Sequence, residues 1–278
     1  MNYGFIKNEV EEEAYVFGSG ELPREILRED GQWDDFLPEY EPQFNLNFDT
    51  SACTIFGTIN AVEILEKRIF NTSPNYSERF HYNLIPLRPP GGDPHAAAES
   101  VRKRGMVDQE LLPMTETFNE YILPEPMPRS IIQKGTEWLQ THEFGHEYLW
   151  RGNPSQEAKN SLLKGALQYS PVGVSVTAWQ MGPDGLYVDG GRPNVHWCVL
   201  IGYRYRDDGA FIRRVFDTYD HEVKELDPSH NIEVAKRYHL AVRVYNDEDK
   251  SDGGFIRKLI NIIHGFYKKF FFTLPVHA

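Results

Sequence analysis

The amino-acid sequence predicts an α+β protein in which helices precede strands. Apolar residues recur with helical spacing from residue 53 to about residue 69, and a second helical pattern covers 155–168. Strand-like segments such as VGVSVTAW, HWCVLIGYRY and RYHLAVRVY dominate after residue 170. Because helices and strands are separated along the chain, we expect a helical lobe followed by a sheet lobe. The 278 residues, of which 40% are hydrophobic, are enough to bury a substantial core.

The composition of residues 1–42 indicates an extended arm. The stretch GSGELPREILREDGQWDDFLPEYEPQ is acidic and contains repeated Gly and Pro. The first residues, MNYGFIKNEVEEEAYVF, lack the basic start and the apolar run of a secretory signal. The chain has two cysteines, Cys53 and Cys198, which are too few for the disulfide framework common in secreted proteins. Together these features predict a cytoplasmic protein.

Cys53 stands where the loop NFDTSAC meets the first helical pattern. Asp49, Thr50 and Ser51 are candidate N-caps of the helix that begins there. The dipole of a helix stabilises a negative sulfur at its N-terminus, and a thiolate is the reactive form of cysteine. A lone cysteine in such a chain is more often a buried structural residue, so Cys53 needs a partner to be a nucleophile.

His196 and Asp217 are the candidate partners of that thiol. His196 opens the strongly apolar strand HWCVLIGY, where a side chain can face a cleft, and Asp217 follows the next strand, FIRRVF. A carboxylate in that position can orient an imidazole and stabilise its charged form, although Asp217 can also be an ordinary turn residue. Cys198, two residues beyond His196, is interpreted as a core residue.

These segments stand in an order that resembles the papain family of cysteine peptidases over about residues 43–245. CTIFGTINAVEIL resembles the family's nucleophile helix, PPGGDPHAAAESVRKRG its Gly-Gly turn and short helix ending at Gly105, and HWCVLIGY its His strand. The separation of Cys53 and His196 also suits a family in which it is about 130 to 150 residues. The resemblance implies a two-lobed fold, with a helical lobe at about 43–168 and an antiparallel, barrel-like sheet lobe at about 169–245.

The resemblance also implies roles for individual residues. Cys53 would attack the scissile carbonyl, and His196 would hold the thiolate as an ion pair and protonate the leaving amine. Asp217, in DTY (217–219), would orient His196 where the family has Asn, and Tyr219 would shield that contact where the family has Trp. The implied function is a cysteine endopeptidase that acts on peptide or protein substrates without a cofactor or a metal.

Substrate binding and the oxyanion hole follow from the same resemblance. Gly91 and Gly92 would pair with the main chain of an extended substrate. The oxyanion-stabilising side chain is either Gln43, ten residues before the cysteine, or Asn47, which stands at the family's spacing. The arm 1–42 is a candidate for covering the cleft in place of the family's long propeptide.

HEFGH (142–146) supports a rival interpretation, because it fits the H-E-x-x-H pattern of zinc peptidases. On a helix, His142 and His146 would bind zinc and Glu143 would act as the base. Gly145 and the surrounding aromatic residues make a poor helix interior, so this alternative is the weaker one. A third alternative is a non-catalytic structural or binding protein on the same scaffold.

Charge and the C-terminal segment suggest the remaining partners. The formal net charge of −12 argues against nucleic acid, because phosphate binding needs a basic surface. The polar stretch 246–254 is expected to be a linker, and 255–278 a basic amphipathic helix. That helix would pack on its own domain or on a second copy, or else bind a membrane surface or a partner.

Overall fold

The computed structural model describes residues 4–8, 22–39, 42–44, 47–85, 91–122, 127–220 and 222–243. Its α-helices are α1 Cys53–Phe70, α2 Glu78–Tyr82, α3 Pro94–Arg104, α4 Phe118–Tyr121, α5 Arg129–Thr141 and α6 Gln156–Ala166, with short 3₁₀ helices at Asp34–Phe36 and Gln109–Leu111. Its strands are β1 His142–Tyr148, β2 Val172–Val176, β3 His196–Tyr205, β4 Phe211–Phe216, β5 Val223–Leu226 and β6 Ala235–Val242.

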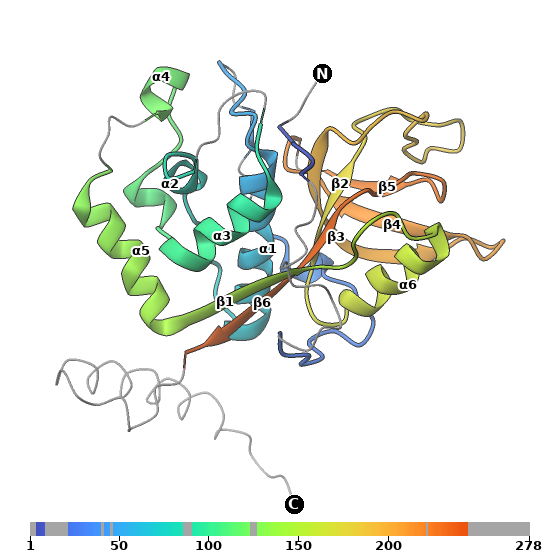
Figure 1. Ribbon diagram of the computed structural model, residues 1–278, viewed down its shortest axis with the longest axis horizontal. Helices are drawn as coiled ribbons and strands as arrows, with labels where there is room; N and C mark the ends of the chain where they lie inside the picture. The colour runs from blue at the N-terminus through green and yellow to red at the C-terminus, as the bar shows by residue number, and fades with distance from the viewer. Residues whose placement is uncertain are drawn as a thin grey trace, which may run out of the picture. The chain divides into compact units, whose positions relative to one another are not determined.

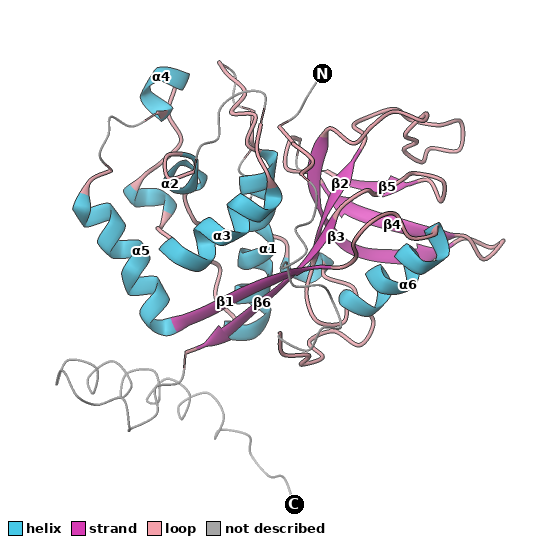
Figure 2. Cartoon of the chain, viewed as in Figure 1, coloured by secondary structure: helices cyan, strands magenta, loops and turns pink. Residues whose placement is uncertain are grey.

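The helices and the sheet occupy two sides of the molecule. Helices α1 to α5 gather on one side, and strands β2 to β5 with α6 on the other (Figures 1 and 2). The predicted combination of a helical lobe with an antiparallel sheet lobe is therefore confirmed. β1 lies within 43–168, the range expected for the helical lobe, but it joins the sheet by pairing with β6.

The strands of the described chain form one antiparallel sheet in the order β1-β6-β2-β3-β4-β5. β2 has the sequence VGVSV and is buried along its whole length, and β3 contains the buried run WCVLI at residues 197–201. Strands buried on both faces need such near-continuous apolar runs. The start of β3 and the end of β4 lie next to each other in this sheet, and the site is built there.

Helix α1 lies where the helical side meets the sheet, and it is buried over most of its length. Ile55, Ile59 and Val62 belong to the main hydrophobic core together with residues of β2, β3 and β6. An amphipathic surface helix would bury one stripe, whereas α1 is enclosed by neighbours on several faces. Its N-terminus is consequently held at a defined place against the sheet.

The predicted helix ends are correct at one place and wrong at another. α3 ends at Gly105 as predicted, and this glycine has a φ of 71°. The N-cap of α1 is Ala52, and no side chain caps the helix, so the prediction that Asp49, Thr50 or Ser51 would do so is wrong. Asp49 instead accepts a hydrogen bond from the backbone N–H of Ser51 at 2.7 Å.

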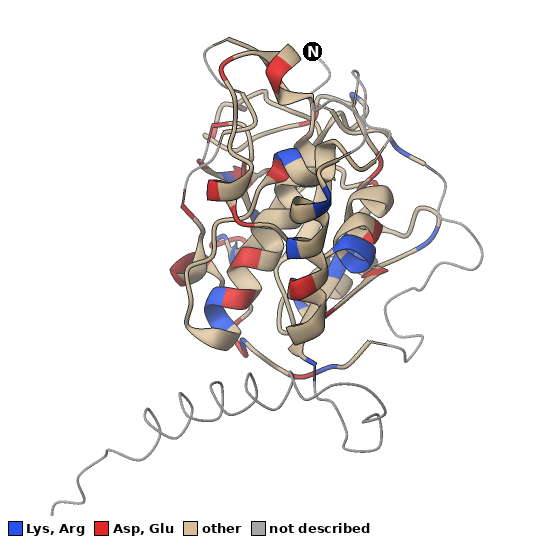
Figure 3. Cartoon of the chain, turned by 90° about the vertical axis from the view of Figure 1, so that its left-hand side faces the viewer, with Lys and Arg blue, Asp and Glu red and all other residues tan. Residues whose placement is uncertain are grey.

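Several expected segments lie outside the described residues. They include residues 1–3 and 9–21 of the arm, the linker 246–254 and the amphipathic segment 255–278. The compact unit that is described ends at Arg243. Within the described chain, no helix combines the length and apolar character that a membrane span requires. Acidic and basic residues are interspersed along the chain on the helical side (Figure 3).

Candidate active site

Cys53 is the first residue of α1, and it is fully buried against β3. A backbone hydrogen bond from Trp197, the second residue of β3, reaches the thiol. One helical turn further along α1, a Cβ on Gly57 would lie 2.7 Å from Cδ1 of Trp197. This close approach of α1 to β3 brings Cys53 to the end of the strand where His196 lies.

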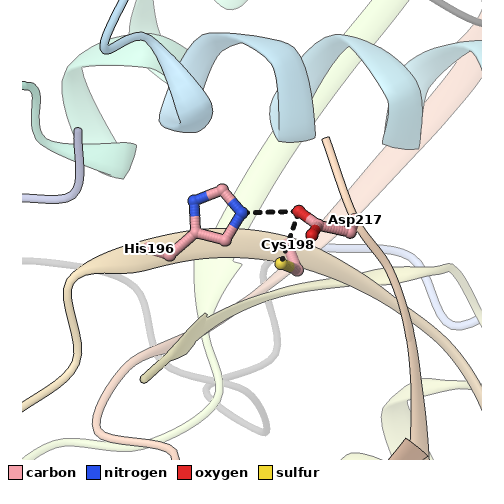
Figure 4. A group of neighbouring side chains, drawn as sticks. All are labelled: His196, Cys198 and Asp217. Carbon is pink, nitrogen blue, oxygen red and sulfur yellow. Dashed lines mark hydrogen bonds and ion pairs between the residues drawn. The ribbon is translucent and has the colours of Figure 1, made fainter. Parts of the chain in front are cut away.

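His196 and Asp217 meet because β3 and β4 are antiparallel neighbours, with Val199 opposite Phe216. His196 opens β3, Asp217 follows β4, and both side chains are fully buried. His196 Nε2 lies 2.6 Å from Asp217 Oδ1 (Figure 4). An ionised carboxylate can only accept, so Nε2 donates and Nδ1 is the ring nitrogen that can take a proton.

Asp217 has a second strong partner, Lys224 of β5, which sequence reasoning did not identify. Lys224 Nζ lies 2.8 Å from Asp217 Oδ2, and it also contacts the carboxylate of Asp220. Burial alone would raise the pKa of Asp217, but the charges of His196 and Lys224 and the hydrogen bonds from both hold it below its ordinary value. The carboxylate is therefore ionised at neutral pH.

Two aromatic rings enclose the imidazole of His196. The ring of Trp179 is perpendicular to it at a centroid distance of 5.9 Å, and the ring of Tyr219 is perpendicular at 6.4 Å. Tyr219 is thus next to His196 as the resemblance implied. Sequence reasoning missed Trp179, whose ring also lies 5.0 Å from Lys224 Nζ.

Gln43 and Asn47, the two candidates for the oxyanion hole, have different hydrogen-bond partners. The backbone N–H of Gln43 donates to the carbonyl of Thr218, which directly follows the site carboxylate, and its Nε2 donates to Asp49 Oδ1 at 3.1 Å. Gln43 is fully buried. Asn47 is exposed, and its Nδ2 donates to the carbonyl of Glu116 at 2.9 Å.

Several opposing effects act on the thiol of Cys53. Burial is the largest and raises the pKa of Cys53 well above its ordinary value, and the negative charges of Asp217 and Asp49 raise it further. The backbone hydrogen bond from Trp197 acts in the opposite direction. In this covered state the sulfur is therefore a protonated thiol.

Residues of the N-terminal arm lie along the glycine turn beside α3. The backbone N–H of Ile6 donates to the carbonyl of Gly92 at 3.0 Å, and the N–H of Gly92 donates to the carbonyl of Gly4 at 2.8 Å. A Cβ on Gly91 would lie 2.2 Å from the carbonyl oxygen of Gly4, so this approach requires glycine. In Figure 1 the dark blue segment at 4–8 lies between the helical side and the sheet.

Phe5 carries the arm into the core of the site. Its backbone N–H donates to the carbonyl of Val195, the residue before β3, at 3.4 Å. Its ring stacks on Trp197 at a centroid distance of 5.7 Å, and the residue is 4% exposed. Phe5 belongs to one buried cluster with Cys53, Trp197 and Tyr148. The arm thus covers the site, at a place that sequence composition did not reveal.

Solved structures with a similar fold include cysteine proteases and their precursors. The digestive procathepsin L 3 of Tenebrio molitor larval midgut aligns with a TM-score of 0.56 and 15% identity, over 86% of this chain and 76% of that one. The bromelain protease from Ananas comosus in complex with the E64 inhibitor aligns with a TM-score of 0.53 and 16% identity, over 75% of this chain and 97% of that one. The fold is that of the papain-like cysteine proteases.

The ragweed pollen allergen Amb a 11, a cysteine protease in its proform, aligns with a TM-score of 0.54 and 14% identity. The alignment covers 75% of this chain and 65% of the Amb a 11 chain, which is less than two thirds of that protein. No protein-family model and no curated protein sequence matches the chain. At these identities the likeness establishes a papain-like fold.

Within the papain-like fold, Cys198 lies directly beside the site. Its Sγ is 3.7 Å from Asp217 Oδ1, and it is a buried member of the main core, as the sequence interpretation had it (Figure 4). Donor atoms of His196, Cys198 and Asp217 lie within 4.8 Å of one another, a spacing that would suit a metal ion. The other oxygen of this carboxylate, Oδ2, is already paired with the Lys224 ammonium at 2.8 Å.

The HEFGH segment is the strand β1, whereas the zinc pattern requires a helix. His142 Nδ1 lies 3.0 Å from the carbonyl oxygen of Trp138, and His146 Nε2 lies 2.9 Å from Glu99 Oε1. The two histidines therefore have separate protein partners, and this geometry does not favour the zinc alternative.

Proposed function

We propose that the protein is a cysteine peptidase that hydrolyses peptide bonds with Cys53 as nucleophile and His196 as base. One observation carries the proposal: the N-terminus of α1 presents Cys53 to the start of β3, where a buried carboxylate holds His196 through Nε2. Such a thiol, imidazole and carboxylate are the parts of a nucleophilic triad. The papain-like fold supports the same reading.

In the proposed reaction, His196 Nδ1 takes the proton of Cys53, and the thiolate attacks the substrate carbonyl carbon. The imidazolium then gives its proton to the leaving amine, which leaves an acyl group on the sulfur. A water molecule, deprotonated by the same imidazole, hydrolyses this thioester. Asp217 stabilises the imidazolium and fixes the tautomer through its 2.6 Å hydrogen bond.

The oxyanion of the tetrahedral intermediate needs donors close to the sulfur. The proposed donors are the Nε2 amide group of Gln43, which has two protons, and the backbone N–H of Cys53. No side chain caps α1, so a side-chain cap does not compete for the N–H groups of its first turn. Gln43 is held next to the carboxylate loop through Thr218.

The arm supports an extended peptide as the substrate. Residues 4–6 form main-chain hydrogen bonds to Gly92 and Val195 on both sides of the site. These backbone groups recognise a polypeptide main chain without regard to its side chains. A peptide substrate would therefore compete with the arm for the same groups.

Labelling of Cys53 with iodoacetamide across pH tests the proposal. We expect labelling below pH 7 in the full-length chain carrying Phe5→Ala, whose site is uncovered, and loss of this labelling in His196→Ala. Cys198→Ala, which removes the other thiol, is the matched control and should label normally. An ordinary thiol profile near pH 8.5 would contradict the proposal and favour the non-catalytic binding protein.

A further inference from the structure

We propose that Lys224 is a positioning residue, whose ion pair with Asp217 makes the carboxylate behind His196 act as a nearly neutral hydrogen-bond acceptor. This inference rests on the proposed cysteine-peptidase function and concerns the tuning of that site. Lys224 takes no part in bond making and acts through Asp217.

The two carboxylate oxygens of Asp217 accept hydrogen bonds from two different partners. Oδ1 accepts from His196 Nε2 at 2.6 Å, and Oδ2 accepts from Lys224 Nζ at 2.8 Å. The carboxylate is fully buried and the Lys224 side chain is 3% exposed, so solvent screens their attraction weakly. The Trp179 ring, 5.0 Å from Nζ, adds a favourable contact for the cation.

An uncompensated charge on Asp217 would impair the chemistry at the sulfur. It opposes the thiolate, because the Asp217 charge raises the pKa of the Cys53 thiol. Lys224 acts with the opposite sign: its charge lowers the pKa of the neighbouring Cys198 thiol, whereas Asp217 raises it.

The titratable and charged groups around this pair come from every element packed on it. Asp217 faces the imidazole and the thiol of β3 and the ammonium of β5, while the ammonium faces two carboxylates and two aromatic rings. The titratable or charged groups are His196, Cys198, Lys224, Asp217 and Asp220, together with Cys53 of α1, whose thiol is affected by the Asp217 charge. The two aromatic rings belong to Trp179 and Tyr187.

A double-mutant cycle tests the proposal by the pH midpoint of Cys53 labelling with iodoacetamide. The full-length variants are Lys224→Met, Asp217→Asn and the double variant, each made with and without Phe5→Ala. Lys224→Met should move the midpoint up by on the order of one pH unit, which slows labelling about tenfold below the midpoint. The double variant, in which a neutral amide meets a neutral side chain, should return to within about threefold of the parent rate.

Asp220→Asn is the matched control, because it removes the other, partly exposed carboxylate on the same lysine and should leave the midpoint in place. Thermal unfolding of each variant separates lost folding from altered chemistry. A purely structural lysine would lower the melting temperature without moving the midpoint, and the double variant would not recover; either result overturns the inference. If the parent itself lacks an activated thiol, the proposed function and this inference fall together.

Discussion

Individual buried cations in this protein differ in what compensates their charge. Lys224 is paired with carboxylates, whereas Lys236 of β6 is fully buried and its Nζ lies 3.5 Å from the ring centroid of Tyr148, without a hydrogen-bond partner among the described residues. Burial lowers the pKa of Lys236 to about 7. A buried ammonium with so little hydrogen bonding costs stability.

Replacement of Lys236 by Met should therefore stabilise the fold. The folded pKa lies below the ordinary lysine value near 10.4, so between about pH 7 and 10 the unfolded chain binds more protons and the wild-type unfolding free energy rises with pH. The gain in Lys236→Met should be on the order of 3 kcal/mol below pH 7 and disappear toward pH 10. Urea unfolding at pH 6 and pH 9 measures this difference.

The control for this prediction is Lys134→Met, because the Lys134 side chain is 53% exposed. Because this site is exposed, Lys134→Met should change the unfolding free energy by less than about 0.5 kcal/mol at either pH. A loss of stability in Lys236→Met at pH 6 would show that the charges of Asp93, Glu99 and Glu147 compensate the ammonium.

Gln43 provides a second residue-scale prediction, on catalysis. If its amide stabilises the oxyanion, Gln43→Ala should lower kcat/KM about 100- to 1,000-fold while the labelling of Cys53 stays within a few-fold. Asn47→Ala, at the alternative position, should leave peptide hydrolysis unchanged because Asn47 bonds to Glu116 at the surface. Steady-state hydrolysis of a fluorogenic peptide measures kcat/KM for both variants. Equal losses of kcat/KM in Gln43→Ala and Asn47→Ala would argue against Gln43 as the oxyanion donor.

At the scale of elements, the arm and the strand β3 control access to the thiol. Residues 4–8 of the arm make main-chain hydrogen bonds, stack the ring of Phe5 on Trp197 and form an ion pair between Lys7 and Glu233. Phe5 is 4% exposed and Ile6 is 37% exposed, so Phe5 is the more deeply buried of the two apolar side chains. Removal of the Phe5 ring should therefore weaken this contact most.

Replacement of Phe5 by Ala should uncover Cys53. Loss of a buried Phe weakens the contact by about 3 kcal/mol, so we expect the rate of Cys53 labelling at pH 7 to rise at least tenfold. Ile6→Ala has the same backbone but removes an exposed side chain, and its labelling rate should match the wild type. Equal rates in all three chains would mean that the arm does not limit access.

At the scale of the whole molecule, the helical side and the sheet side are held together by α1 against β3. Gly57 is essential to this contact, since a Cβ there would lie 2.7 Å from the Trp197 ring, whose residue is fully buried. A displaced Trp197 would also move His196, the residue before it. Stability and catalysis are coupled at this place.

Gly57→Ala should accordingly lower the unfolding free energy by about 1 to 3 kcal/mol and slow Cys53 labelling, because overpacking separates α1 from β3. Gly165→Ala on α6 is the matched control: a Cβ at Gly165 has no heavy atom within 4 Å, and alanine is the better helix former. Its unfolding free energy should rise by about 0.5 kcal/mol in urea titrations. A Gly57→Ala protein as stable as the wild type would mean that Trp197 can move without cost.

The sequence by itself determined the features that neighbouring residues encode. The helix beginning at Cys53, the strand opening at His196 and the α+β order follow from apolar periodicity, which needs no knowledge of distant contacts. The pairing of His196 with Asp217 was also predictable, because consecutive antiparallel strands place the start of one beside the end of the next.

Only the tertiary structure decided which distant groups meet these residues. In the sequence Lys224 is one polar residue of a short strand, and only the place of β5 in the fold brings it to Asp217. Likewise, HEFGH forms a strand because β6 pairs with it. Gln43 reaches Thr218 across 175 positions of the chain, and this contact is the reason to propose Gln43 rather than Asn47 for the oxyanion hole. Such contacts depend on how whole helices and strands pack and on the paths of the loops between them. Local sequence patterns do not encode these paths, so they do not predict which side chains meet at the site.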